Sequence, residues 1–148
     1  MIIALAADHA GYQLKDELAS WLREAGHQVL DLGTNGPDSV DYPHFGRRLA
    51  EAIADGEAER GVVVCGSGIG ISIAVNRNPA CRCARVDDPL SAALAREHND
   101  ANVLALGARL VGQDMAKACV QAFLGTQFAG GRHQRRVDQL STLLQESD

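Results

Sequence analysis

The chain has 148 residues, of which 46% are hydrophobic and 22% are charged. These fractions are typical of a soluble globular protein and exclude a largely disordered chain. The length favours one domain over residues 1–148. A formal net charge of -5 disfavours a nucleic-acid-binding surface, because such surfaces are usually basic.

The sequence carries no sign of export or membrane insertion. The apolar start, residues 1–7, has no positive charge before it and meets Asp8 short of signal-peptide length. No apolar run approaches the ~18 residues of a membrane span. We therefore expect a cytoplasmic protein that has no membrane partner.

The four cysteines at positions 65, 81, 83 and 119 are too sparse for the disulfide scaffold of a small secreted domain. Reduced thiols are therefore expected. The close pair Cys81 and Cys83 lacks the wider spacing and the second ligand pair of a typical zinc site. We expect neither a metal nor another cofactor.

Hydrophobic patterns along the chain predict strands and helices in alternation. Apolar runs predict strands over residues 2–7, 28–32, 61–65, 82–86 and 103–106. A turn-rich loop, residues 33–39, follows the second strand. Helices are predicted through Leu14, Leu18 and Leu22 as far as Gly26, from the N-cap Asp41 through Phe45, Leu49 and Ile53, and over residues 71–76, 89–98, 113–124 and 132–144.

Residues 61–65, with three consecutive valines, form the strongest strand pattern. The run is apolar on both sides, so we place it at the centre of a parallel sheet that is covered on both faces. Five strands separated by helices imply right-handed crossovers. The predicted fold is α/β: a three-layer α/β/α sandwich with a five-stranded parallel, Rossmann-like doubly wound sheet.

Ligands of open α/β sheets bind outside the carboxyl ends of the strands. The first strand ends at Asp8 and His9, and the third ends at Cys65. The fourth helix carries His98 and Asn99 towards the start of the fifth strand. His9 with Asp8 could also form a simple turn pair, and His98 could cap its helix.

The glycine-rich loop Gly66-Ser67-Gly68-Ile69-Gly70 leads from the third strand into a helix. Its N–H groups could hold an anion or oxyanion, although a tight strand-to-helix turn needs the same glycines. The spacing fits neither a P-loop nor the dinucleotide fingerprint. Cys65 alone is compatible with a small buried core residue. Next to a helix N-terminus, however, an ionised thiol is favoured and can act as a base.

Arg132 and Arg136 are four residues apart and share one helix face, an arrangement that suits a phosphate dianion or a solvated basic surface. Arg109, just after the fifth strand, could also reach the carboxyl edge of the sheet.

Five motifs together resemble the ribose-5-phosphate isomerase B family, which also includes galactose-6-phosphate isomerase subunits. The resemblance runs from Ile2 to about Leu140 with the motifs in the same order and at similar spacing. The motifs are Asp8-His9-Ala10-Gly11, Asp41-Tyr42-Pro43, Cys65-Gly66-Ser67-Gly68-Ile69-Gly70, Arg96-Glu97-His98-Asn99-Asp100-Ala101-Asn102 and Gly130-Gly131-Arg132-His133-Gln134-Arg135-Arg136-Val137.

The resemblance implies an aldose–ketose isomerase that interconverts ribose 5-phosphate and ribulose 5-phosphate through an enediolate. Cys65 would be the base and His98 the acid that opens the sugar ring. The residues implied to bind substrate are Asp8, His9, Gly66, Ser67, Gly68, Ile69, Gly70, Asn99, Arg109, Arg132 and Arg136. The family also implies a homodimer or homotetramer whose active sites draw on both chains.

The chain departs from the family's pattern in two places. Some members have a glutamate in the glycine loop and lack the cysteine, whereas this chain has Ile71 there and no carboxylate from Gly66 to Ile73. Residues 81–88 also differ, so no substrate contact is carried over to them. Two other functions remain open: a hexose-6-phosphate isomerase for allose or galactose 6-phosphate, and a non-catalytic nucleotide-binding module.

Overall fold

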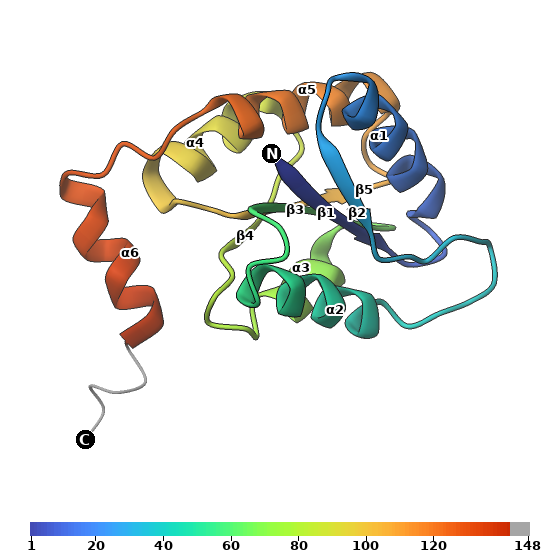
Figure 1. Cartoon of the computed structure of the whole chain (residues 1–148), viewed down its shortest axis with the longest axis horizontal. Helices are drawn as coiled ribbons and strands as arrows, with labels where there is room; N and C mark the ends of the chain where they lie inside the picture. The colour runs from blue at the N-terminus through green and yellow to red at the C-terminus, as the bar shows by residue number, and fades with distance from the viewer. Residues whose placement is uncertain (143–148) are drawn as a thin grey trace.

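The computed structural model describes residues 1–142 as a sheet with helices on both faces (Figure 1). The predicted ends of the last helix, Leu143 and Leu144, lie outside the described residues. Within the described part of the chain, no helix is both long and apolar enough to cross a membrane. The strands are β1 (Ile2–Ala7), β2 (Gln28–Asp31), β3 (Arg60–Cys65), β4 (Cys83–Arg85) and β5 (Val103–Gly107).

All strand pairs of the five-stranded sheet are parallel, in the order β2-β1-β3-β5-β4. This confirms the predicted α/β fold and the central position of β3. The connection from β1 leads outward to β2, and the next connection returns across β1 to β3. The chain therefore reverses direction between β1 and β3, and such a switch point leaves a crevice at the carboxyl ends of the strands.

Helices cover the sheet in two layers, with one helix outside both (Figure 1). One layer contains α1, α4 and α5, and the other contains α2 and α3, while α6 stands beyond the end of α4. The helices are α1 (Tyr12–Glu24), α2 (Tyr42–Ala54), α3 (Ile69–Val75), α4 (Pro89–Asn99), α5 (Gln113–Gly125) and α6 (Arg132–Thr142).

The strands feed two separate cores because successive side chains point to opposite faces. On β3, Val62 and Val64 pack with α1, α4 and α5, whereas Val63 and Cys65 pack with α2 and α3. Every one of these four side chains is at most 4% exposed. Cys65 thus ends β3 on the α2–α3 face, where the crevice opens.

Several predicted boundaries differ from the structure by one or two residues, and two of these differences have a cause in the local backbone. The fourth strand is shorter than residues 82–86, since the Arg82 N–H donates to the side chain of Asn102 and not to a neighbouring strand. The third helix begins at Ile69, two residues early, because Gly68 adopts the left-handed conformation (φ 77°) that starts it. Asp41 is the N-cap residue of α2 as predicted, but its side chain makes no capping hydrogen bond.

A buried ammonium group links α1 to the end of β2. The Lys15 side chain is fully buried, and its Nζ lies 2.8 Å from both carboxylate oxygens of Asp31. It also donates to Asp16 (2.7 Å) and to the Asn35 side chain (3.0 Å). A charge removed from water is stable only with such a complete set of acceptors.

We predict that Lys15→Met lowers the free energy of unfolding by about 2 to 3 kcal/mol, because Asp31 loses its partner while 24% of its side chain stays exposed. Asp16→Asn is the control and should cost under about 1 kcal/mol, since the Asp16 side chain is 50% exposed. Urea unfolding measures both. A Lys15→Met cost as small as that of Asp16→Asn would contradict a structural role for the ion pair.

Candidate functional site

A cavity of about 360 Å³ opens at the carboxyl ends of β1 and β3. Most of its walls come from the segments that follow β1, β3 and β5, as expected for a switch point. Tyr42 adds a wall from the start of α2, and its ring packs against Gly70. The lining residues are Asp8, His9, Ala10, Tyr42, Cys65, Gly66, Ser67, Gly70, Arg109 and Leu110.

The glycine loop lies directly against the end of β5. A Cβ atom on Gly68 would meet the Leu106 carbonyl carbon at 2.8 Å, and one on Gly107 would meet the Ser67 oxygen at 2.6 Å. Only glycine permits such a backbone approach. The contact holds the loop so that the Gly68 N–H donates to the Cys65 Sγ at 3.1 Å. The thiol of Cys65 therefore has a hydrogen-bond donor fixed on it by the backbone.

Asp8 and His9 are both held by backbone N–H groups. The buried Asp8 carboxylate accepts from Ala10 (3.0 Å) and Gly11 (3.2 Å), which orders the turn between β1 and α1. His9 accepts from the Val40 N–H through Nδ1 at 3.1 Å. A neutral His9 ring with an acceptor at Nδ1 carries its proton on Nε2, where it can be donated.

Arg109 brings a positive charge to the loop. Its backbone N–H donates to the Gly66 carbonyl at 3.0 Å, and a Cβ on Gly66 would lie 3.2 Å from the guanidinium. The guanidinium is therefore packed on the loop beside the cavity. A cation and a row of loop N–H groups together suit an anionic ligand or a developing oxyanion.

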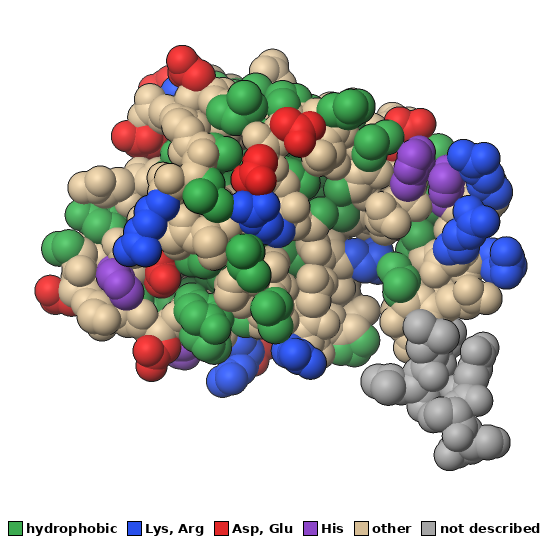
Figure 2. Space-filling model, turned by 180° about the vertical axis from the view of Figure 1, so that it is seen from behind, with side chains coloured by type: hydrophobic (Ala, Val, Ile, Leu, Met, Phe, Trp, Pro, Cys, Tyr) green, Lys and Arg blue, Asp and Glu red, His purple; other side chains and the backbone are tan. Residues whose placement is uncertain are grey.

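A second cluster of predicted residues lies at the junction of α4 and α6, around a separate cavity of about 380 Å³. His98 stacks on His133, with ring centroids 4.5 Å apart and planes at 17°. Figure 2 shows histidine side chains beside basic side chains, coloured for Lys or Arg, at this end of the molecule. The cavity is lined by His98, Asn99, Arg132, His133, Arg136, Val137 and Leu140.

His133 was not predicted as a functional residue, although it lies in the same motif as the predicted phosphate ligands Arg132 and Arg136. Partial burial lowers the pKa of His133, and the nearby positive charges of His98, Arg132 and Arg136 lower it further. Glu97 opposes this only as the smallest contribution. The lowered pKa favours the uncharged form of the His133 ring.

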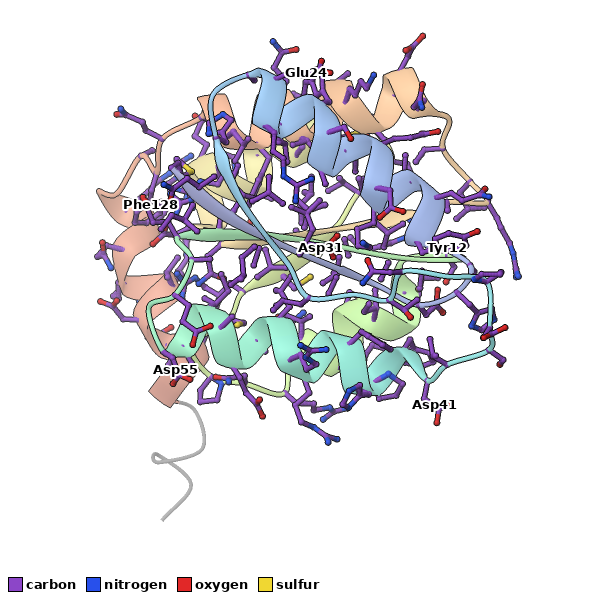
Figure 3. All side chains as sticks on the ribbon, turned by 45° about the vertical axis from the view of Figure 1, so that its right-hand side comes forward. Tyr12, Glu24, Asp31, Asp41, Asp55 and Phe128 are labelled. Atoms are coloured by element: carbon purple, nitrogen blue, oxygen red, sulfur yellow. The ribbon has the colours of Figure 1, made fainter. Side chains whose placement is uncertain are left out.

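The two clusters stand at opposite ends of the sheet within one chain. α4 begins after the carboxyl end of β4 and runs back, so His98 lies near Asn102, whose carbonyl accepts from the Gly61 N–H at the start of β3. Gly61 and Cys65 are four residues apart on β3, roughly 13 Å at the rise of a strand. In Figure 3, Tyr12 and Asp41 mark the edge where the strands end, and Phe128, which precedes α6, lies on the far side. One chain alone does not bring His98, Asn99, Arg132 and Arg136 to the cavity of Cys65.

The four cysteines differ in the hydrogen bonds and the pKa values of their thiols. The Cys65 Sγ accepts a hydrogen bond, whereas the Cys81 Sγ donates one to the Ala50 carbonyl (3.7 Å) and needs its proton to do so. Burial raises the pKa of Cys81 and of Cys119 to about 11, and burial also raises the pKa of Cys83. All four are free thiols, and among residues 1–142 no cluster of three or more His, Cys, Asp or Glu side chains could hold a metal ion.

These differences predict selective alkylation. At pH 8 a thiol whose pKa is about 11 is ionised to roughly one part in a thousand, so Cys81 and Cys119 should react slowly with iodoacetamide. We expect Cys65 to be modified first in the native protein, followed by peptide mass mapping over time. Equal rates at Cys65 and Cys119 in the folded protein would contradict this, and urea-unfolded protein provides the equal-rate control.

Comparison with known proteins agrees with the resemblance seen in the sequence. Residues 3–140 match the model of the Ribose/Galactose Isomerase family. The chain is 46% identical over 143 residues to ribose-5-phosphate isomerase B of Escherichia coli, which covers 97% of this chain and 96% of that protein.

Solved structures of similar chains have the same fold. A ribose-5-phosphate isomerase B from Clostridium thermocellum has a TM-score of 0.97 at 47% identity, with full coverage of both chains. The enzyme of that name from Mycoplasma genitalium, solved with bound ribulose-5-phosphate, has a TM-score of 0.92 at 36% identity, over 99% of this chain and 97% of that one.

Proposed function

The chain belongs to the Ribose/Galactose Isomerase family, and we propose that it interconverts ribose 5-phosphate and ribulose 5-phosphate, a reaction of the pentose phosphate pathway. The observation that carries this proposal is the cavity at the switch point, where Cys65 faces loop amides and Arg109. Aldose–ketose isomerisation moves one proton between adjacent carbons, so it needs a base and donors for an enediolate oxygen.

Cys65 is the proposed base. Its thiolate removes the proton from C2, next to the aldehyde carbon, and the resulting thiol returns it to C1. In the same reaction the hydroxyl on C2 loses its proton and the oxygen on C1 gains one, so that the aldehyde becomes an alcohol and C2 becomes the ketone. The loop formed by Gly66, Ser67, Gly68, Ile69 and Gly70 holds the enediolate oxygen through its N–H groups, except that of Gly68, which donates to Cys65. Asp8 and His9 bind the sugar hydroxyls. The backbone bonds that fix Asp8 and His9 support this role, since preorganised groups lose little freedom on binding.

The second cluster supplies the ring-opening acid and the phosphate anchor. His98 acts as the acid: it donates a proton to the ring oxygen of the closed aldose while the bond from that oxygen to C1 breaks and the C1 hydroxyl loses its proton to water. Asn99, Arg132 and Arg136 bind substrate, the arginines at its phosphate. The distance between the clusters supports a site shared by two chains, in which His98 comes from a second copy. A homodimer with two such sites satisfies this requirement, and a tetramer would pair two dimers.

An exposed apolar surface next to the cavity supports the same association. Ile69 and Ile73 on α3 are each 51% exposed, and Tyr42 is 41% exposed. Tyr42 and Gly70 line both the cavity and an adjoining groove of about 520 Å³ between α2 and α3. A second copy seated on this surface would cover the apolar side chains beside Cys65.

We predict that Cys65→Ala reduces kcat at least a hundredfold while KM changes only a few-fold, because loss of a positioned base costs about 10²–10⁴ in rate. Cys65→Ser should be nearly as inactive, since an alcohol is a far weaker base. The measurement is a coupled assay on ribose 5-phosphate, with allose 6-phosphate and galactose 6-phosphate in parallel. A Cys65→Ala variant that keeps a tenth of the wild-type kcat would show that Cys65 is a core residue and not the base. Faster turnover of a hexose phosphate would favour that substrate, and nucleotide binding without any turnover would favour the binding module.

Mixing two inactive variants tests the shared site. Cys65→Ala and His98→Asn chains, unfolded together and refolded, should form mixed dimers with one site that has both Cys65 and His98. Random pairing makes about half of the dimers mixed, so roughly a quarter of wild-type activity should return. Each variant refolded alone is the control. No gain on mixing, with mixed dimers detected by native mass spectrometry, would contradict a site built from two chains.

A further inference from the structure

Arg85 lies in the segment that departs from the family's sequence pattern, residues 81–88, and is not among the predicted site residues. It ends β4 and pairs in register with Ala105 of β5. The side chain is 26% exposed, and it reaches the glycine loop, where Nε donates to the Ser67 carbonyl at 3.0 Å. Its Nη1 donates to Asp87 at 2.7 Å, which holds the guanidinium from the other side.

The peptide unit that Arg85 contacts is the one that contacts Cys65. The carbonyl belongs to Ser67, and the N–H of the same peptide belongs to Gly68, which donates to the Cys65 Sγ at 3.1 Å. In a planar trans peptide the C=O and N–H bonds point in opposite directions. Arg85 therefore binds one end of this peptide while the Cys65 sulfur binds the other.

The cation strengthens this arrangement in two ways. Charge-assisted hydrogen bonds are stronger than neutral ones, so Arg85 fixes the peptide plane and with it the direction of the Gly68 N–H. A positive donor on the carbonyl also polarises the amide, as in hydrogen-bonded chains, and makes its N–H a better donor to a thiolate. Asp87 reduces the net charge of Arg85 but leaves the bond to Ser67 intact.

We propose that Arg85 is a positioning residue that stabilises the Cys65 thiolate through the Ser67–Gly68 peptide. Arg85 does not line the cavity, so it acts on the sulfur without contacting substrate. The titratable and charged groups that face the cavity from the surrounding elements are Asp8, His9, Tyr42 and Arg109. Because all four are unchanged in an Arg85 variant, they form a constant background for the test.

The test is the pH dependence of Cys65 alkylation in the full-length protein, followed by iodoacetamide and peptide mass mapping. In Arg85→Met the midpoint should move up by about one pH unit, which slows alkylation about tenfold at pH 7. Arg85→Lys, which keeps the charge and one donor, should recover part of the shift. Arg82→Met is the matched control, because Arg82 is 23% exposed and its side-chain hydrogen bonds go to Asp100.

Turnover adds a second readout. This role rests on Cys65 as the base of the proposed function. The Arg85→Met substitution should therefore lower kcat about tenfold at pH 7 and leave KM within a few-fold, and kcat should recover at higher pH. An alkylation midpoint that is unchanged in folded Arg85→Met or Arg85→Gln would overturn the proposal, even if kcat fell. Alkylation needs no substrate, so a protein that isomerises no sugar phosphate would still report on Arg85, and the two failures are distinguishable.

Discussion

The backbone contact between the glycine loop and the end of β5 determines the geometry of the whole site. Gly68 and Gly107 both lie so close to neighbouring backbone that a Cβ on either would come within 3 Å of it. The contact sets where the Gly68 N–H points, and it brings the Ser67 carbonyl within reach of Arg85 on the next strand. A larger residue at either position would have to push the loop away from Cys65.

The loop also explains why one of four similar thiols differs from the rest. Burial alone keeps a cysteine protonated, as it does for Cys81, Cys83 and Cys119. Cys65 is buried too, at 4% exposure, but it sits at the end of a strand where a backbone amide can donate to it. The direction of one hydrogen bond, and not the degree of burial, separates a potential base from core cysteines.

Much of the fold was predictable from periodicity, because apolar runs and helical spacing report directly on which residues face a core. The predicted Rossmann-like sheet and its central strand are confirmed. The strand order was not predictable, since nothing in the sequence marks that the connections into β3 and β4 each cross a neighbouring strand. Side-chain capping was also not predictable. The Asp41 carboxylate makes no capping hydrogen bond, whereas the Asp88 carboxylate accepts one from the Ser91 N–H at the start of α4.

The candidate site was predictable as a set of residues but not as an arrangement in space. Sequence order places His98 just before the fifth strand, and the same reasoning that puts Cys65 at a carboxyl end puts His98 at an amino end. A helix that returns along a parallel sheet cannot deliver its last residues to the edge from which it started. Arg85 and His133 were missed because each acts on a neighbour, one through a peptide and one through a stacked ring, and such contacts leave no pattern in a single sequence. The polarity of α4 is therefore the physical reason why the proposed function needs a second chain. With Cys65 as the proposed base and His98 as the proposed ring-opening acid on opposite edges of the sheet, the two groups meet only where the edge of one copy lies against the opposite edge of another.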